Sequence, residues 1–352
     1  MGWGRTRQHT NAFDLIRLVA ASMVLWSHQH ALMGLPEPGV AVLRESVGGA
    51  GVFIFFVISG YLNTLSVIRH RSVREFLTSR GLRIYPALIV CVVFTVLLGA
   101  CVSPDIRPYF DYQLLSFIGK DITLFTGVKA GVSHAVFAGN VMPNALNGSL
   151  WTLPYEVKMY VVLALCFVAF RYNPLPALFA SGCGLVLLGF SALDTFWLHF
   201  SFLFIAGSFV ATMQKLNKLV PAIAALLLLA CLFAAGGREF YAYYLLLAAA
   251  VIGLGSVKLP SSLRLPLDLS YAIYLYAFPI QQLSAMLTKN FWLGLLFSVV
   301  VTFAMASLSA LFVERPTQKL RFLRRQSRAD AGRQGLAVAV SSVAATSAEV
   351  AE

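Results

Sequence analysis

The sequence predicts an all-α integral membrane protein with about ten transmembrane helices and both termini in the cytoplasm. Composition is the first observation: 59% of the 352 residues are hydrophobic and 12% are charged, whereas a soluble domain carries about 25% charged residues. Mean hydropathy is +0.77, and no water-soluble fold of this size could bury so much apolar surface. The second observation is a series of apolar runs, and the third is the placement of the positive charges between them.

Ten apolar runs are long enough to be membrane spans, since a span needs about 20 mainly apolar residues. The third and fifth are short, and prolines lie near the ends or inside several runs, which membrane helices tolerate. The predicted spans are 13–35, 49–68, 86–102, 150–170, 175–191, 196–213, 219–235, 240–257, 268–288 and 291–313.

The basic residues set the orientation. With the N-terminus inside, nineteen of the 27 lysines and arginines fall in inner segments or the C-terminal tail and six in outer loops. Cytoplasmic loops are the ones enriched in Lys and Arg, so both termini are predicted to be cytoplasmic. The same placement explains the net charge of +12 as a topology signal, so we expect the lipid bilayer and no nucleic acid as a partner. The five cysteines show no CxxC spacing, and no metal site is expected.

The segments outside the spans divide the chain into two parts. We assign residues 1–316 to a membrane domain and 317–352 to a basic, then Ala/Ser-rich, cytoplasmic tail without a regular pattern, which we expect to be disordered. The long outer segment 103–149 is interpreted as a partial lid, with an interfacial helix near 111–125.

The first span carries four ionisable residues, and charges inside a span are costly enough to suggest a function. At 100° per residue, Arg17 lies about 60° and His28 about 40° from Asp14, whereas His30 lies about 160° away. One stripe therefore holds Asp14, Arg17 and His28. An interfacial ion pair plus a structural histidine is the alternative.

His28 and Glu156, which lies in the fourth span, are expected at a similar depth in the bilayer. His28 is about 16 Å beyond Arg17 along the helix, in the outer half of the bilayer, and Glu156 lies about 9 Å below the outer edge of its span. A histidine and a carboxylate at one depth can act as a base with an orienting group. Whether the two side chains touch is left open by the sequence.

The inner loop before the third span ends in Arg80 and Arg83, three residues apart and next to Pro86. Such a pair can grip a phosphate with its planar guanidinium groups. With Arg17 near the same side, this favours an anionic, phosphate-bearing ligand that enters from the cytoplasm. A generic positive-inside loop is the alternative.

Six motifs in order resemble those of the membrane acyltransferase-3 family, which includes O-antigen, exopolysaccharide and Nod-factor acyltransferases. They cover residues 13 to 316 and read FDLIR at Phe13–Arg17 with WSH ending at His28, GVFIFFVISGY at Gly51–Tyr61, RGLRIYP at Arg80–Pro86, SLWTLPYE at Ser149–Glu156, SYAIYL at Ser270–Leu275 and ERP at Glu314–Pro316.

The resemblance implies transfer of an acyl group from cytoplasmic acyl-CoA, a co-substrate rather than a bound cofactor, to an acceptor at the outer face. It implies His28 as the essential histidine and Arg17, Arg80 and Arg83 as arginines that bind CoA; we place Asp14 with them. Many relatives have a histidine two positions after the SYxIYL motif. Here that position is Ala277, so any role of that second histidine is lost or moved.

These observations predict an O-acyltransferase, most simply an acetyltransferase, of the bacterial inner membrane that acts on a cell-surface or lipid-linked carbohydrate. His28 is the predicted base, with Glu156 to orient it, and an acyl-histidine intermediate stays open. Sugars stack on aromatic rings, so Tyr109, Tyr112 and Trp151 are predicted acceptor contacts, with an interfacial belt as the alternative. A transporter or flippase and a non-catalytic partner of a polysaccharide assembly complex are the rival functions.

Overall fold

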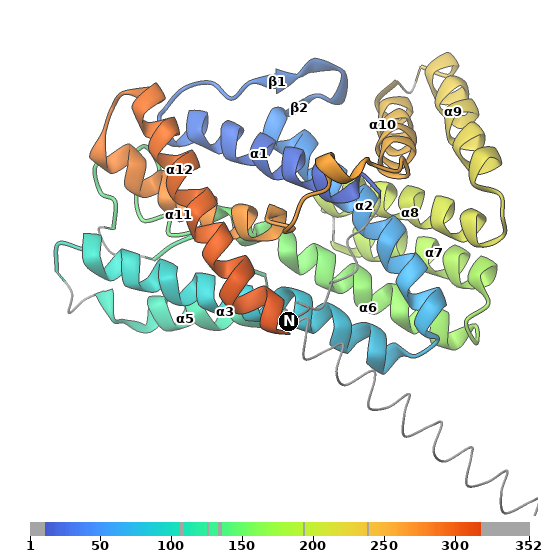
Figure 1. The fold of residues 1–352 in the computed structure, drawn as a ribbon, viewed down its shortest axis with the longest axis horizontal. Helices are drawn as coiled ribbons and strands as arrows, with labels where there is room; N and C mark the ends of the chain where they lie inside the picture. The colour runs from blue at the N-terminus through green and yellow to red at the C-terminus, as the bar shows by residue number, and fades with distance from the viewer. Residues whose placement is uncertain are drawn as a thin grey trace, which may run out of the picture.

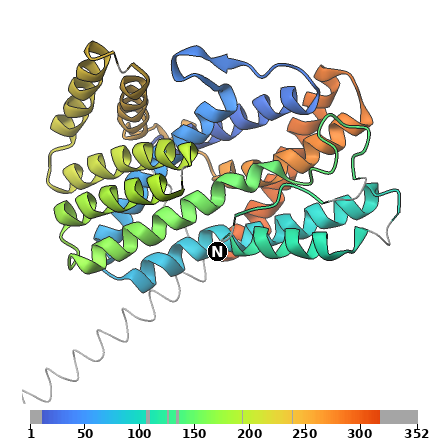
Figure 2. The same ribbon diagram turned by 180° about the vertical axis from the view of Figure 1, so that it is seen from behind.

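The computed structural model describes residues 11–105, 109–124, 127–132, 136–192, 194–237 and 239–317. The predicted tail from 318 onward and the first ten residues lie outside the described part. Within it, the chain folds into a bundle of long helices (Figures 1 and 2). The long helices are α1 (Phe13–Leu32), α2 (Val47–His70), α3 (Val73–Val102), α6 (Leu153–Ala169), α7 (Pro174–Ala192), α8 (Thr195–Lys215), α9 (Leu219–Ala235), α10 (Glu239–Gly255), α11 (Ser270–Leu287) and α12 (Phe291–Ser309).

Short elements connect or extend the long helices. Between α1 and α2, β1 (Gly39–Val40) pairs antiparallel with β2 (Glu45–Ser46) around a single 3-10 turn, η1 (Ala41–Leu43). The other short elements are α5 (Tyr112–Thr123), η2 (Gly148–Thr152), η3 (Ser261–Leu263) and the π-helical η4 (Ala310–Glu314).

Each of the ten predicted spans coincides with one long helix. In the part of the chain that the structure describes, five stretches are long and apolar enough to cross a membrane: Val47–His70, Val73–Val102, Gly148–Ala169, Thr195–Lys215 and Phe291–Thr317. Three shorter ones are apolar: Pro174–Gly189, Leu219–Ala235 and Glu239–Gly255. The helices α1 and α11 are in neither group, and both carry many polar side chains. The chain is therefore a multi-pass membrane protein, and ten crossings with both ends inside stay a prediction.

Helix α3 is longer than the sequence predicts. The predicted span begins at 86, whereas α3 begins at Val73 and continues through Pro86. Its start is capped, because the Ser72 hydroxyl accepts a hydrogen bond from the backbone N–H of Glu75 at 3.4 Å. Arg80 and Arg83 therefore lie on a helix one turn apart and not in a loop.

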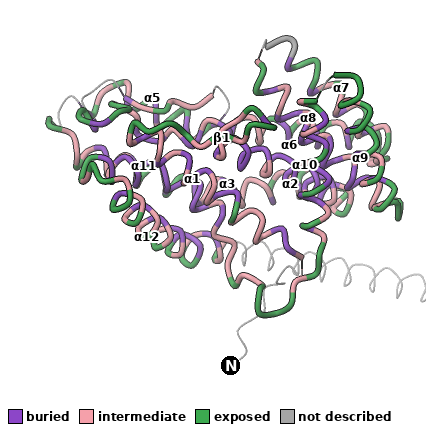
Figure 3. Tube along the Cα trace, turned by 90° about the horizontal axis from the view of Figure 1, so that it is seen from above, coloured by how far each residue is buried: buried purple, intermediate pink, exposed green. Residues whose placement is uncertain are grey.

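Helix α2 lies at the centre of the bundle, where it contacts α1, α8, α10, α6 and α3. In its most apolar window 72% of the residues are buried, against 28% for Phe291–Thr317. Figure 3 shows this contrast: buried colour runs along α1 and α2, and α12 is mostly intermediate or exposed. The exposed side chains of α12 are large and apolar (Trp292, Leu293, Leu296, Val300, Leu308), as expected for a lipid-facing helix.

Helices α2 and α8 pack with their backbones in contact. A Cβ atom added at Gly60 would overlap the carbonyl of Phe204, and one at Gly207 would overlap the carbonyl of Val57. The Ser208 hydroxyl also donates to the Gly60 carbonyl at 3.3 Å. Small residues that let helices approach this closely are typical of packing in membranes.

Candidate active site

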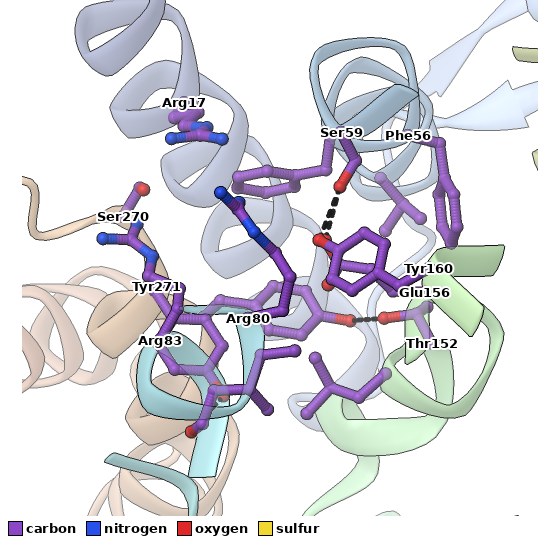
Figure 4. Close-up of a pocket in the computed structure, with 15 residues that line it drawn as sticks. Arg17, Phe56, Ser59, Arg80, Arg83, Thr152, Glu156, Tyr160, Ser270 and Tyr271 are labelled. Carbon is purple, nitrogen blue, oxygen red and sulfur yellow. Dashed lines mark hydrogen bonds between the residues drawn. The ribbon is translucent and has the colours of Figure 1, made fainter. Parts of the chain in front are cut away.

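A cavity of about 80 Å³ lies among α1, α2, α3, α6 and α11. Figure 4 shows its side chains from these elements converging on one space. The residues that line it are Arg17, Val52, Phe55, Phe56, Ser59, Arg80, Arg83, Ile84, Thr152, Leu153, Glu156, Tyr160, Ser270, Tyr271 and Tyr274. The lining thus combines three guanidinium groups and one carboxylate with hydroxyl groups and aromatic rings.

Two of the three arginines are held by one carboxylate. Asp268, just before α11, forms ion pairs with Arg83 and with Arg17, the latter at 3.7 Å. Arg17 also pairs with Asp14 at 4.0 Å, the i,i+3 contact that belongs to the alternative interpretation of the first span. The other oxygen of Asp268 accepts from the Ser270 hydroxyl at 2.5 Å, so this carboxylate ties α1, α3 and α11 together.

Arg80 differs from the other two arginines. Among the described residues it has no ion pair; its Nη2 donates to the Ser66 hydroxyl at 3.3 Å, and its Cζ lies 5.7 Å from the centre of the Phe76 ring. Its Nε is buried without a hydrogen-bond partner. Figure 4 shows its guanidinium group reaching toward Arg17. A cation with an unused donor in a cavity is a place where an anion can bind.

A cluster of hydroxyl groups surrounds Glu156 in the same cavity. The Ser59 hydroxyl donates to Glu156 Oε1 at 2.5 Å, and the Tyr160 hydroxyl donates to the same oxygen. The Ser59 and Tyr160 oxygens are 2.8 Å apart, and the Asn63 amide donates to Ser59 at 3.2 Å. Glu156 is therefore held by α2 as well as by its own helix.

His28 lies outside this cavity. Its Nδ1 is 3.5 Å from the Ser149 hydroxyl, and its ring meets Phe278 edge-on with centroids 5.5 Å apart. The carboxylate of Glu37, which accepts from the Ser27 hydroxyl, supplies the negative charge that acts on the His28 ring. His30 points elsewhere, since its Nδ1 is 3.0 Å from the Trp26 carbonyl, as predicted from helix geometry.

The structure brings together Arg17, Arg80, Arg83 and Glu156, but it does not pair Glu156 with His28. Glu156 contacts Ser59 and Tyr160. His28 instead contacts Ser149, which lies in η2, the 3-10 helix just before the helix α6 that carries Glu156. The carboxylate that acts on His28 is instead Glu37, in the segment between α1 and β1.

The three aromatic residues predicted to contact an acceptor lie in different surroundings. Tyr109 is fully buried, and its hydroxyl donates to the Val96 carbonyl at 2.8 Å. Its ring is therefore not accessible to a sugar in this structure. Tyr112 is 81% exposed. Trp151 packs edge-on against Phe196 with centroids 5.1 Å apart. The helix predicted near 111–125 is present as α5, packed on α3.

Sequence reasoning missed Asp268, Ser59, Tyr160 and Glu37. Asp268 could have been found from the sequence, because it is a single acidic residue at the predicted inner end of a span. The three arginines predicted near that side require a counter-ion. Ser59 and Tyr160 had no such signal, since hydroxyl groups inside spans are common. Ala277 is 1% exposed within α11, so the position where many relatives carry histidine is part of the packed interior.

Comparison with known proteins gives three matches. Residues 10–314 match the family model described as an acyltransferase domain. An O-acetyl transferase of Shigella phage Sf6 is 31% identical over 90% of this chain and 97% of its own length. Nodulation protein 10 of Rhizobium leguminosarum bv. viciae is 29% identical over 89% of this chain and 94% of its own. No solved structure matches the chain.

Proposed function

The chain belongs to the membrane acyltransferase-3 family and is an O-acyltransferase, and from this premise we propose that it transfers an acetyl group from cytoplasmic acetyl-CoA to a hydroxyl of a cell-surface or lipid-linked carbohydrate. The acetyl group is supported by the name of the phage relative, an O-acetyl transferase. Family membership favours the enzyme over a transporter or a non-catalytic partner.

The observation that carries the proposal is the arginine-lined cavity. Arg80 has no ion pair among the described residues and its Nε lacks a partner, so a phosphate of CoA would supply the missing acceptor. Asp268 orients Arg83 and Arg17 beside it. Guanidinium groups bind phosphate through two parallel hydrogen bonds, and the inner ends of α1 and α3 are predicted to face the cytoplasm.

In the proposed reaction His28 acts as general base. The acceptor hydroxyl gives its proton to His28 while its oxygen attacks the thioester carbonyl carbon. The carbon–sulfur bond then breaks, and the proton passes from His28 to the CoA thiolate. Glu37 balances the charge of His28 during the transfer. Because His28 lies about 16 Å from Arg17 along α1, the donor must bind extended along the helix, with its phosphates at the arginines.

The proposal places the enzyme in the inner membrane of a bacterium. Support comes from the apolar helices, from the excess of basic residues in the predicted inner loops, and from relatives in a rhizobium and in a phage of Shigella. A polyhydroxylated acceptor at the outer face is supported by the position of His28 in the predicted outer half.

Arg80→Gln tests the donor site. We expect acetyl-CoA affinity in nanodiscs, measured by calorimetry, to fall about 10- to 100-fold, because charge-assisted hydrogen bonds contribute about 1.5–3 kcal/mol. Arg74→Gln is the matched control, since Arg74 lies on the same helix but is exposed, and it should keep the affinity of the wild type. Equal affinity in both variants would rule out the cavity as the phosphate site.

A further inference from the structure

The arginine-lined cavity and His28 contact different residues of η2 and α11. The lining of the cavity includes Thr152 of η2 and Tyr274 of α11. The residues that contact the His28 ring are Ser149 and Phe278, which are not part of that lining. The two places that the proposed reaction must connect are therefore distinct in this structure.

Thr152 and Tyr274 are joined by a hydrogen bond, with their oxygens 2.5 Å apart. Both residues are 6% exposed. Figure 4 shows the bond as the dashed line that ends on Thr152. The Tyr274 ring also meets Phe55, a lining residue from α2, with centroids 5.9 Å apart. We call this pair the Thr152–Tyr274 bridge.

Helix geometry places the bridge between the cavity and His28. Ser149 precedes Thr152 by three residues in η2, about 6 Å at the 3-10 rise. Phe278 follows Tyr274 by four residues in α11, also about 6 Å. Both contacts of His28 are thus one turn beyond the bridge, on the predicted outer side. The backbone of η2 packs directly against Phe278, because a Cβ atom added at Gly148 would lie 2.6 Å from its ring.

We propose that Thr152 and Tyr274 are positioning residues that keep the donor thioester away from His28 and from outer water until an acceptor binds. The inference rests on the proposed function. When the Thr152–Tyr274 hydrogen bond breaks and the two side chains separate, the thioester can reach His28 and the acceptor hydroxyl. When the bridge is closed, the two side chains stand between the thioester and His28.

The bridge protects the donor from a definite side reaction. If water reached the thioester, its oxygen would attack the carbonyl carbon, the carbon–sulfur bond would break, and acetic acid and the CoA thiol would form. One proton of the water would go to the thiolate and the other would stay with the acid. Acetyl-CoA would then be consumed without an acceptor, and exclusion of water from a reactive group prevents such losses.

The test measures release of CoA thiol from acetyl-CoA by the purified protein in nanodiscs, without any acceptor. Tyr274→Phe and Thr152→Val each remove one hydroxyl with little change in shape, and Thr152→Ser keeps the hydroxyl. Tyr276→Phe is the matched control: it removes another hydroxyl from α11, on a side chain that is 1% exposed and does not line the cavity. Affinity for acetyl-CoA is measured for each variant.

We expect acceptor-independent release to rise about five- to tenfold in Tyr274→Phe and Thr152→Val, the factor for one lost hydrogen bond. Tyr276→Phe should match the wild type, and Thr152→Ser should release thiol more slowly than Thr152→Val. Release is compared at saturating acetyl-CoA, so that a difference in donor affinity does not affect the result. Unchanged release in the first two variants, or an equal rise in Tyr276→Phe, would overturn the inference. Failure of the wild type itself to bind acetyl-CoA would instead contradict the proposed function, and the inference would fall with it.

Discussion

Arg80 and Arg83 lie one turn apart on α3, yet their surroundings differ. Arg83 shares the Asp268 carboxylate with Arg17, whereas Arg80 contacts the Ser66 hydroxyl and the Phe76 ring. A paired arginine mainly fixes geometry, and an arginine without an ion pair retains charge for a ligand. At the scale of the residue, Asp268 is thus an internal anion that orders two guanidinium groups and leaves Arg80 available.

The two histidines of α1 give a matched prediction at this scale. His28→Ala should lower acetyl transfer about 10²- to 10⁴-fold, the usual contribution of a general base, while the protein still accumulates in the membrane. His30→Ala should keep most activity, because His30 contacts Trp26 and Phe291 on another face. Transfer is measured as acetylation of surface carbohydrate by mass spectrometry. Equal losses in the two variants would contradict the role of His28.

The residues of the site were predictable only where helix geometry decides the answer. Period and spacing predict that Asp14, Arg17 and His28 share a stripe, and the Asp14–Arg17 pair is present. Hydrogen bonds between side chains on different helices depend on tertiary packing, and the spacing of residues in the sequence does not predict that packing. For this reason the sequence could not tell that Glu156 bonds Ser59 and Tyr160 rather than orienting His28.

At the scale of the element, α3 shows how local signals compete. Ser72 and Glu75 have the Ser-x-x-Glu spacing that is typical of a helix N-terminus, and the Ser72 hydroxyl caps α3. The predicted start at 86 followed hydropathy alone, which drops in the basic stretch before it. The basic stretch from Val73 onward extends the apolar helix at its N-terminal end, and this extension carries Arg80 and Arg83 to the cavity.

Helix α5 contains a carboxylate whose titration should affect stability. Asp121 is fully buried, and its Oδ1 accepts from the Lys129 N–H at 2.8 Å. Burial raises the pKa of Asp121 to about 7, although the Lys129 bond and the Lys120 charge lower it in part. Between about pH 4 and pH 7 the folded protein therefore holds a proton that the unfolded chain has lost. Stability should fall as pH rises through this window and then level off.

Asp121→Asn removes this dependence, because an amide stays neutral and can accept the same hydrogen bond. We expect the variant to be more stable than the wild type by about 1–3 kcal/mol at pH 8 and equal to it near pH 4. Thermal unfolding in detergent at several pH values measures the difference. Asp105→Asn, at an exposed position, is the control. A constant difference at every pH would show that Asp121 does not titrate in this range.

The contact of α2 with α8 gives a second prediction for an element. Gly207→Ala places a methyl group against the Val57 carbonyl, and forced separation of packed helices costs about 1–3 kcal/mol. We expect a lower unfolding temperature and less protein in the membrane. Gly253→Ala is the control, since nothing lies within 4 Å of a Cβ added there. A Gly207→Ala protein as stable as this control would show that the two helices can move apart freely.

The whole molecule combines exposed apolar helices with an arginine-lined cavity. The positions of the ten long helices were predictable, because hydropathy and length mark them directly in the sequence. Their neighbours were not: α2 meets α8, far along the chain, and α11 lies beside α1. Those long-range contacts create the cavity, so the sequence could indicate the chemistry of its arginines but not the bridge that separates them from His28.

Transfer across the membrane is the central claim, and one measurement tests it directly. Radiolabelled acetyl-CoA is supplied to sealed vesicles from cells that express the protein, either inside-out or right-side-out, and the label in carbohydrate is counted. We expect label only in inside-out vesicles, where the cytoplasmic face is exposed to the donor, and none with His28→Ala. Label that appears when acetyl-CoA is offered to right-side-out vesicles, or no label in either orientation, would contradict a cytoplasmic donor site and an outer acceptor.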